Sequence, residues 1–346
     1  MSNSQEFISV LGAGSWGSCL AHRIAIKGYP VTLWMRREEQ AEEIRTTRRN
    51  SRYLGDYELH PGITPTTDLK EAAKAKIIVI AVPSKGFRAT SRELGDYVKP
   101  DQILLSATKG IEPKTYLRMS QILKEETACL KIGVISGPNL ALEVMQEHPT
   151  ATIIASRFDE VVEAGMRIFN ANLFRTYGSH DIVGVEMAGA LKNVLAIASG
   201  MISGLGYGAN TRAFLITRGL SELIRLGMHY DIDPMTMSGL AGVGDIFVTC
   251  SSEKSRNFRV GKSLGEGNTL EETLKAMNQV AEGVRTAQAA YDLAQKFGET
   301  LPIVEATYHI LHKGLPLTQA QMLLLGRPMH YEHNPKRIIR DELPPK

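Results

Sequence analysis

The 346-residue chain has few cysteines and little compositional bias. Cys19, Cys129 and Cys250 are odd in number and far apart, so they predict neither a disulfide framework nor a metal motif. Glycine (31) and proline (15) stay below the level of low-complexity chains. Ordinary apolar (43%) and charged (22%) fractions exclude disorder, collagen and coiled coil. The length predicts about two globular domains.

Strong net charge and long apolar runs are also missing. Lysine and arginine (40) against aspartate and glutamate (37) leave +3, which is too little to predict a nucleic-acid partner. The longest unbroken apolar run, residues 77–83, is far shorter than the roughly 18 residues of a membrane helix. The opening MSNSQEF has neither the basic nor the apolar part of a secretory signal. We therefore expect a cytoplasmic protein with no integral membrane segment.

The first half of the chain alternates short apolar runs with amphipathic stretches. This alternation predicts an α/β fold, with a parallel sheet covered by helices on both faces. Small, basic or amide-bearing residues follow the runs, at the edge where such sheets bind ligands. The expected strands are residues 7–11, 31–34, 77–82, 103–106, 132–136 and 152–155.

The second half changes character near residue 181, where strand-like runs stop. Stretches 186–203, 210–228, 269–277 and 286–296 have helical spacing and predict an all-helical C-terminal domain. We expect an α/β domain over residues 1–180 and a helical domain over residues 181–333. The polar, proline-terminated residues 334–346 predict a flexible tail.

A glycine-rich turn follows the first expected strand. Gly12, Gly14 and Gly17 allow a tight turn, close approach of a pyrophosphate and close helix–strand packing, respectively. The alternative is a merely structural glycine turn. At the end of the second strand, Arg36 stands where an NAD-selective enzyme usually has an acidic residue. Arg36 favours NADP(H) through its 2′-phosphate, unless the side chain is simply solvated.

Lys192 is the only charged residue of an apolar helix after Glu186. Small residues share its face, so a bulky ligand has room to approach, and desolvation would bring its pKa into a useful acid–base range. The alternative is a lysine that reaches along the helix to water. Asn193 adds an adjacent donor and acceptor.

Asp245 precedes an apolar run, where a carboxylate should pair with a cation such as Lys192 or cap a helix. Ser255, Arg256 and Asn257 place a hydroxyl, a guanidinium and an amide in consecutive positions. This set suits the oxygens of a phosphate monoester, although a solvated basic loop is the alternative.

These residues lie in segments that resemble the bacterial-type NAD(P)-dependent sn-glycerol-3-phosphate dehydrogenases. The resemblance runs from about residue 8 to residue 327. Its carrying segments match in order and are VLGAGSWG, AVPS, SATKGIE, VISGPNLALEV, GVEMAGALKNVLAIASGMISGLGYGAN, LITRGLSEL, GLAGVGDIFVTCSSEKSRNFRVG and VAEG.

Together with the glycine-rich turn, the resemblance implies a dinucleotide-binding Rossmann domain over residues 1–180 and a helical substrate-binding and catalytic domain over residues 181–333. It also implies a role for each matched position. Lys192 would be the general acid/base, with Lys109 between cofactor and substrate and Asp245 as the third catalytic residue. Asn139 and Phe258 depart from the common family residues, which puts a contact at each in doubt. Cofactor contacts are implied for Gly12, Gly14, Ser15, Trp16, Gly17, Arg36, Lys109, Ala141, Arg256, Val280 and Glu282, and substrate contacts for Lys109, Gly137, Asn139, Lys192, Asn193, Asp245, Ser255, Arg256 and Asn257.

The implied reaction is reduction of dihydroxyacetone phosphate to sn-glycerol 3-phosphate with NADP(H) or NAD(H), in glycerophospholipid synthesis. We expect a homodimer that acts on this small molecule. No metal is predicted, because the pairs His309/His312 and His330/His333 lack further ligands. The alternatives are a sugar-acid or nucleotide-sugar dehydrogenase, the latter using Cys250 as nucleophile, and a non-catalytic dinucleotide sensor.

Overall fold

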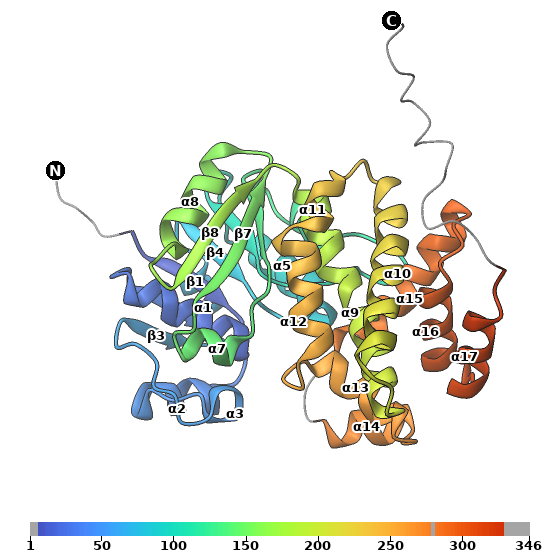
Figure 1. Cartoon of the computed structure of the whole chain (residues 1–346). Helices are drawn as coiled ribbons and strands as arrows, with labels where there is room; N and C mark the ends of the chain where they lie inside the picture. Colours follow the sequence, from blue (N-terminus) through green and yellow to red (C-terminus); the bar gives the residue numbers. More distant parts are fainter. Residues whose placement is uncertain (1–5, 278–280, 329–346) are drawn as a thin grey trace, which may run out of the picture.

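The glycine-rich turn lies between a strand and a helix, as its spacing predicts. Strand β1 (Ile8–Leu11) is buried throughout, and helix α1 (Ser15–Ile26) begins directly after Gly14, its N-cap residue. This computed structural model describes residues 6–277 and 281–328. Figure 1 shows the strands gathered in one half of the molecule and helices α9 to α17 in the other.

Eight strands form one sheet in the order β3-β2-β1-β4-β5-β6-β7-β8. The sequence predicts six of them but not β3 and β8. β3 contains Pro65, and β8 buries only alternate residues over most of its length, so neither edge strand has the continuous apolar run of the central strands. The remaining bounds are β2 Val31–Trp34, β3 Ile63–Thr66, β4 Ile77–Ile80, β5 Ile103–Ser106, β6 Ile132–Ser136, β7 Thr150–Ser156 and β8 Phe174–Ser179.

The predicted parallel sheet followed by helices is confirmed, with one local exception. Paired strands among β1 to β6 run parallel, but β7 is antiparallel to β6, with Ile154 opposite Ile135. Between β6 and β7 lies only the short helix α7 (Ala141–Met145), which packs against α1. Because this connection does not cross a face of the sheet, the chain returns in the opposite direction.

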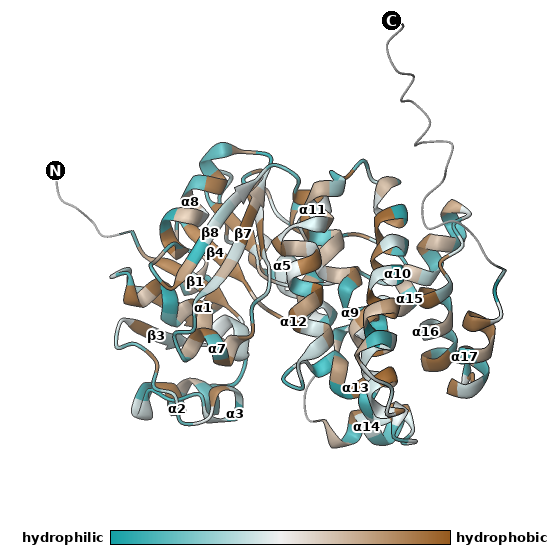
Figure 2. Cartoon of the chain, in the orientation of Figure 1, coloured by the Kyte–Doolittle hydropathy of each residue, from teal (hydrophilic) through white to brown (hydrophobic). Residues whose placement is uncertain are grey.

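Apolar side chains cover both faces of the sheet. Val10 belongs to one buried cluster and its neighbour Leu11 to another, because successive residues of a strand point to opposite faces. Figure 2 shows apolar residues concentrated in the strands, whereas α2 on the surface is mostly hydrophilic. The helices of this half are α2 Glu38–Thr47, α3 Ser51–Leu54, α4 Leu69–Ala72, α5 Ser84–Gly95, α6 Met119–Glu126 and α8 Asp159–Phe169.

Helix α9 (Ile182–Gly204) is the core of the helical half. It is long and apolar enough to cross a membrane, yet 94% of its apolar stretch is buried inside the protein. Glu186 and Lys192 interrupt its apolar sequence, so a search for unbroken apolar runs does not detect this long apolar helix. The other elements are α10 Ala209–Met228, α11 Pro234–Ser238, the π-helical turn η1 Leu240–Gly244, α12 Asp245–Ser251, α13 Arg256–Gly265, α14 Leu270–Ala276, α15 Glu282–Phe297, α16 Pro302–Lys313 and α17 Leu317–Leu325.

The apolar core continues from the sheet into the helical half. One buried cluster contains Ile111 and Val134 of the sheet half together with Val185 and Ala188 of α9. The last strand ends shortly before α9 begins. A functional division at residues 180/181 stays a prediction, and the tail predicted at 334–346 lies outside the described residues.

Helices α9 and α13 touch backbone to backbone. A methyl group on Gly261 would overlap the carbonyl oxygen of Ile197, and one on Gly200 would overlap that of Phe258. Only glycine permits this approach, which places the first turn of α13 against the middle of α9.

Gly261→Ala should therefore destabilise the protein by about 1–3 kcal/mol, because the two helices must separate. The matched control is Gly86→Ala in α5, whose added methyl group would meet no other atom within 4 Å. The control should raise stability by up to about 1 kcal/mol through helix propensity. Urea unfolding of both variants tests this, and a Gly261→Ala protein as stable as the wild type contradicts it.

Candidate active site

Three charged side chains from distant parts of the chain meet at the end of β5 and β6. Asp245 is buried at the start of α12, directly after the π-helical turn η1. Its Oδ1 accepts a hydrogen bond from Lys192 Nζ at 2.5 Å, and its Oδ2 accepts one from Lys109 Nζ at 2.6 Å. The carboxylate therefore pairs with two ammonium groups and does not cap its own helix.

Burial controls the protonation of Lys192. Its side chain lies within apolar helix α9, and this desolvation lowers the pKa of Lys192 from 10.5 to about 8. The charge of Asp245 opposes the shift, whereas the nearby charge of Lys109 adds to it. The amine is thus close to the range in which a general acid or base works near neutral pH.

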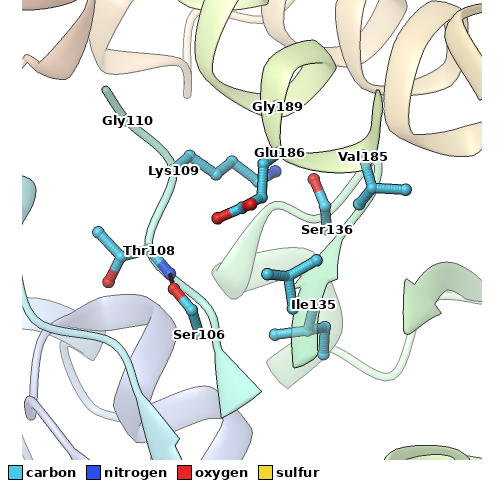
Figure 3. Close-up of a pocket in the computed structure, with 10 residues that line it drawn as sticks. Ser106, Thr108, Lys109, Gly110, Ile135, Ser136, Val185, Glu186 and Gly189 are labelled. Carbon is cyan, nitrogen blue, oxygen red and sulfur yellow. Dashed lines mark hydrogen bonds between the residues drawn. The ribbon is translucent and has the colours of Figure 1, made fainter. Parts of the chain in front are cut away.

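Lys109 reaches this cluster across a gap left by Gly189. Its Nζ also donates to the Gly137 carbonyl oxygen at 3.1 Å. A methyl group on Gly189 would lie 2.8 Å from Ser136 Oγ and 3.6 Å from Lys109 Cγ. Figure 3 shows Lys109 beside Ser136 and Glu186 in a small pocket between the strand ends and α9. Gly189 therefore allows the sheet-side lysine to enter the site.

Thr249 completes the cluster, and sequence reasoning missed it. Lys192 Nζ donates to Thr249 Oγ1, and that hydroxyl lies 3.3 Å from Asp245 Oδ1. Thr249 is one helical turn after Asp245, so its position on the same face of α12 was the available signal.

The glycine-rich turn fits a dinucleotide. Gly12 has φ +107°, and a methyl group there would lie 2.8 Å from the backbone of Ala81. A methyl group on Gly17 would overlap the Gly12 carbonyl oxygen, so only glycine allows α1 to pack this closely against the turn. Gly14 instead faces open space, because a methyl group there would have no neighbouring atom within 4 Å. This pattern of two tight glycines and one open glycine is what a bound pyrophosphate requires.

Arg36 lies where a ribose phosphate is expected. It is exposed two residues after β2, and its guanidinium has no hydrogen-bond or ion-pair partner among residues 6–277 and 281–328. Ser15 and Trp16 open α1 and are partly buried; Ser15 Oγ donates to the Tyr53 carbonyl oxygen at 3.0 Å. Ala141 begins α7 and is also partly buried.

A chain of amides runs beside Lys192. Gly283 N donates to Asn257 Oδ1 at 2.9 Å, and Asn257 Nδ2 donates to Asn193 Oδ1 at 2.8 Å. These bonds settle the orientation of both side-chain amides. The Asn193 oxygen is used in this way, which leaves its amino group as the donor for a ligand.

The predicted phosphate-binding residues have different surroundings. Ser255 Oγ accepts a hydrogen bond from Phe258 N at 3.3 Å and so caps α13. Arg256 is the first residue of that helix and is exposed, whereas Asn257 is buried. Asn139 is turned towards β7: its Nδ2 donates to the Ala151 carbonyl oxygen at 2.9 Å.

Glu282 links the two halves at the first turn of α5. Ser84 N donates to Glu282 Oε1 at 3.1 Å, and Ser84 Oγ donates to Oε2. Glu282 lies next to Gly283 at the start of α15, so adjacent residues contact the sheet half and Asn257. Val280, an implied cofactor contact, and the pair His330/His333 lie outside the described residues.

Two protein-family models together match most of the chain. The family model of the NAD-dependent glycerol-3-phosphate dehydrogenase N-terminus matches residues 7–162, and that of the C-terminus matches residues 181–322. The chain belongs to the NAD-dependent glycerol-3-phosphate dehydrogenase family.

The similarity to individual relatives covers almost the whole chain. A glycerol-3-phosphate dehydrogenase [NAD(P)+] of Geobacter sulfurreducens is 46% identical over 94% of this chain and 99% of its own. One from Macrococcus caseolyticus is 41% identical over 92% of this chain and 98% of its own. The crystal structure of glycerol-3-phosphate dehydrogenase from Coxiella burnetii is 36% identical, with a TM-score of 0.90, over 93% of this chain and 99% of that one.

The rival nucleotide-sugar interpretation fails on chemistry. It needs a cysteine thiolate, and burial raises the pKa of Cys250 to about 12. Reactive cysteines are partly exposed and have a lowered pKa, whereas Cys250 is fully buried and its pKa is raised. A non-catalytic dinucleotide sensor would not need an acid or base, so it does not account for the desolvated Lys192.

Proposed function

We propose that this chain catalyses the reversible, NAD(P)H-dependent reduction of dihydroxyacetone phosphate to sn-glycerol 3-phosphate. The observation that carries the proposal is the buried cluster of Lys109, Asp245 and Lys192 beside a turn that fits a dinucleotide. Membership of the family named above agrees with it. The product would supply glycerophospholipid synthesis.

Lys192 acts as the general acid in this reaction. The glycine-rich turn would hold a reduced nicotinamide dinucleotide, which would supply a hydride for the C2 carbonyl carbon. Lys192 Nζ gives its proton to the carbonyl oxygen, which becomes the hydroxyl, and in the reverse direction the neutral amine takes that proton back. Asp245 orients Lys192, and Lys109 adds positive charge near the developing oxyanion.

Ligand contacts at some distance from the reacting carbon position the substrate. Arg256 and the amides of Asn193 and Asn257 hold the phosphate and hydroxyl oxygens, and this binding energy orients the carbonyl. We assign the cofactor to Gly12, Gly14, Ser15, Trp16, Gly17, Arg36, Lys109, Ala141, Arg256, Val280 and Glu282, and the substrate to Lys109, Gly137, Asn139, Lys192, Asn193, Asp245, Ser255, Arg256 and Asn257.

We also propose a role for each domain, a cellular location and an oligomeric state. Residues 1–180 form the dinucleotide-binding domain and residues 181–333 the substrate-binding and catalytic domain, and each domain also adds a few contacts to the other's ligand. The three cysteines are free and buried, which agrees with a reducing, cytoplasmic location. A homodimer has a surface available on α17, where Met322, Leu323 and Leu325 are exposed.

Mixing the protein with NADPH and dihydroxyacetone phosphate should oxidise the nicotinamide, as followed by the loss of absorbance. Lys192→Met should keep NADPH binding but lower kcat by at least about 100-fold, the range of general acid catalysis. Cys250→Ser is the matched control, because its thiol has no role in the reaction. A folded protein without turnover, or a fully active Lys192→Met variant, contradicts the proposal.

The reaction should depend on pH through Lys192. Reduction requires the ammonium form, so its kcat/KM should fall as pH rises through about 8, and oxidation of glycerol 3-phosphate should rise through the same range. Asp245→Asn removes the charge that raises the pKa of Lys192, so any residual activity should show this transition at lower pH. Profiles in both directions that stay flat from below to above this pH would overturn the assignment.

Arg36 should set the preference between cofactors. Arg36→Ala removes a partner for the 2′-phosphate, so kcat/KM for NADPH should fall by about tenfold or more while that for NADH changes little. The control is Arg45→Ala, an exposed arginine already paired with Glu38 and Glu42. An equal loss for the two cofactors would assign Arg36 to another role.

A further inference from the structure

The carbonyl oxygen of Ala13, inside the glycine-rich turn, accepts hydrogen bonds from two side-chain amides. Gln40 Nε2 donates to it at 2.7 Å, and Asn50 Nδ2 donates at 3.0 Å. Asn50 Nδ2 also donates to Ser18 Oγ of α1 at 2.8 Å. Asn50 and Ser18 are fully buried and Gln40 is nearly so. Two buried amides from the segment after β2 therefore hold one peptide of the turn.

The orientation of these amides is settled by their other partners. Arg37 Nη2 donates to Gln40 Oε1 at 3.2 Å, so the amino group of Gln40 faces Ala13. That amino group also donates to Asn50 Oδ1 at 3.1 Å, which turns the Asn50 amino group to the same carbonyl. Arg37 directly follows Arg36, and the network thus joins the expected ribose-phosphate region to the glycine-rich turn.

Holding the Ala13 carbonyl also aims the next N–H group. The peptide bond is planar and trans, so the C=O of Ala13 and the N–H of Gly14 point in opposite directions. With the oxygen held by Gln40 and Asn50, the Gly14 N–H points away from them. Within the described part of the chain this N–H donates to no protein acceptor, and Gly14 is the glycine that faces open space.

The turn gains in two ways from this arrangement. A carbonyl oxygen that faced the ligand would repel the oxygens of a pyrophosphate, and here that oxygen is turned away and fully hydrogen-bonded. The Gly14 N–H is ready to donate without rearrangement when an anion arrives, as preorganised donors do.

We propose that Gln40 and Asn50 are positioning residues of the dinucleotide site, which hold the Ala13–Gly14 peptide in the orientation that binds the pyrophosphate. This inference rests on the proposed cofactor role of the turn. It assigns to both residues an effect on cofactor affinity that neither exerts by contact with the ligand.

The test is the dissociation constant of NADPH, measured by fluorescence titration of the full chain. Gln40→Met keeps the side-chain length but removes both donated bonds, so the Kd of NADPH should rise about tenfold, the size of one hydrogen bond. At saturating NADPH, kcat and the KM for dihydroxyacetone phosphate should change far less. Asn50→Ser, which shortens the side chain away from Ala13, should act in the same direction and serves if Gln40→Met does not fold.

The matched control is Gln102→Met. Gln102 is equally buried and its Nε2 donates to the carbonyl oxygens of Ala73 and Ala75, in the same half of the molecule. This variant should unfold at a lower temperature but bind NADPH with unchanged Kd. A folded Gln40→Met or Asn50→Ser protein with wild-type affinity overturns the inference, as does an equal loss in Gln102→Met.

The same titration separates this inference from the proposed function. Wild type that binds NADPH but does not turn over dihydroxyacetone phosphate contradicts the proposed reaction and leaves the affinity comparison decisive. Wild type that binds no NADPH overturns both.

Discussion

The buried carboxylate of Asp245 is the constraint on which the molecule depends. It is 1% exposed and pairs with Lys109 from the end of β5 and with Lys192 from the middle of α9. Loss of either lysine would leave the buried carboxylate with one ammonium group instead of two, which lowers the stability of the fold. The sheet, α9 and α12 must therefore meet in one geometry, and the interaction that joins them also tunes the proposed acid.

Much of this arrangement follows from the sequence through two physical rules. Loops after parallel strands gather at one edge of a sheet, which brings the turn at Gly12 and the lysine at position 109 together. Charged residues in apolar helices must find partners, which connects Lys192 with Asp245. Both rules depend on residue type and order alone, so the sequence is enough to apply them.

The remainder depends on tertiary contacts that residue type does not specify. The edge strands β3 and β8 lack a strong apolar run, and the reversal at β7 depends on how α7 packs. The direction of a side-chain amide is set by its neighbours, so the bonds of Asn257 and Gln40 are visible only in the structure. Thr249 has an ordinary place in an apolar helix until Lys192 is seen beside it.

The first two residues of α15 divide their bonds between the two sides of the molecule. Glu282 is bonded to Ser84 of the sheet half, and Gly283 to Asn257 of the helical half. The bond that orients the Asn257 amide therefore comes from within the helical half, whereas the neighbouring residue joins that half to the first turn of α5.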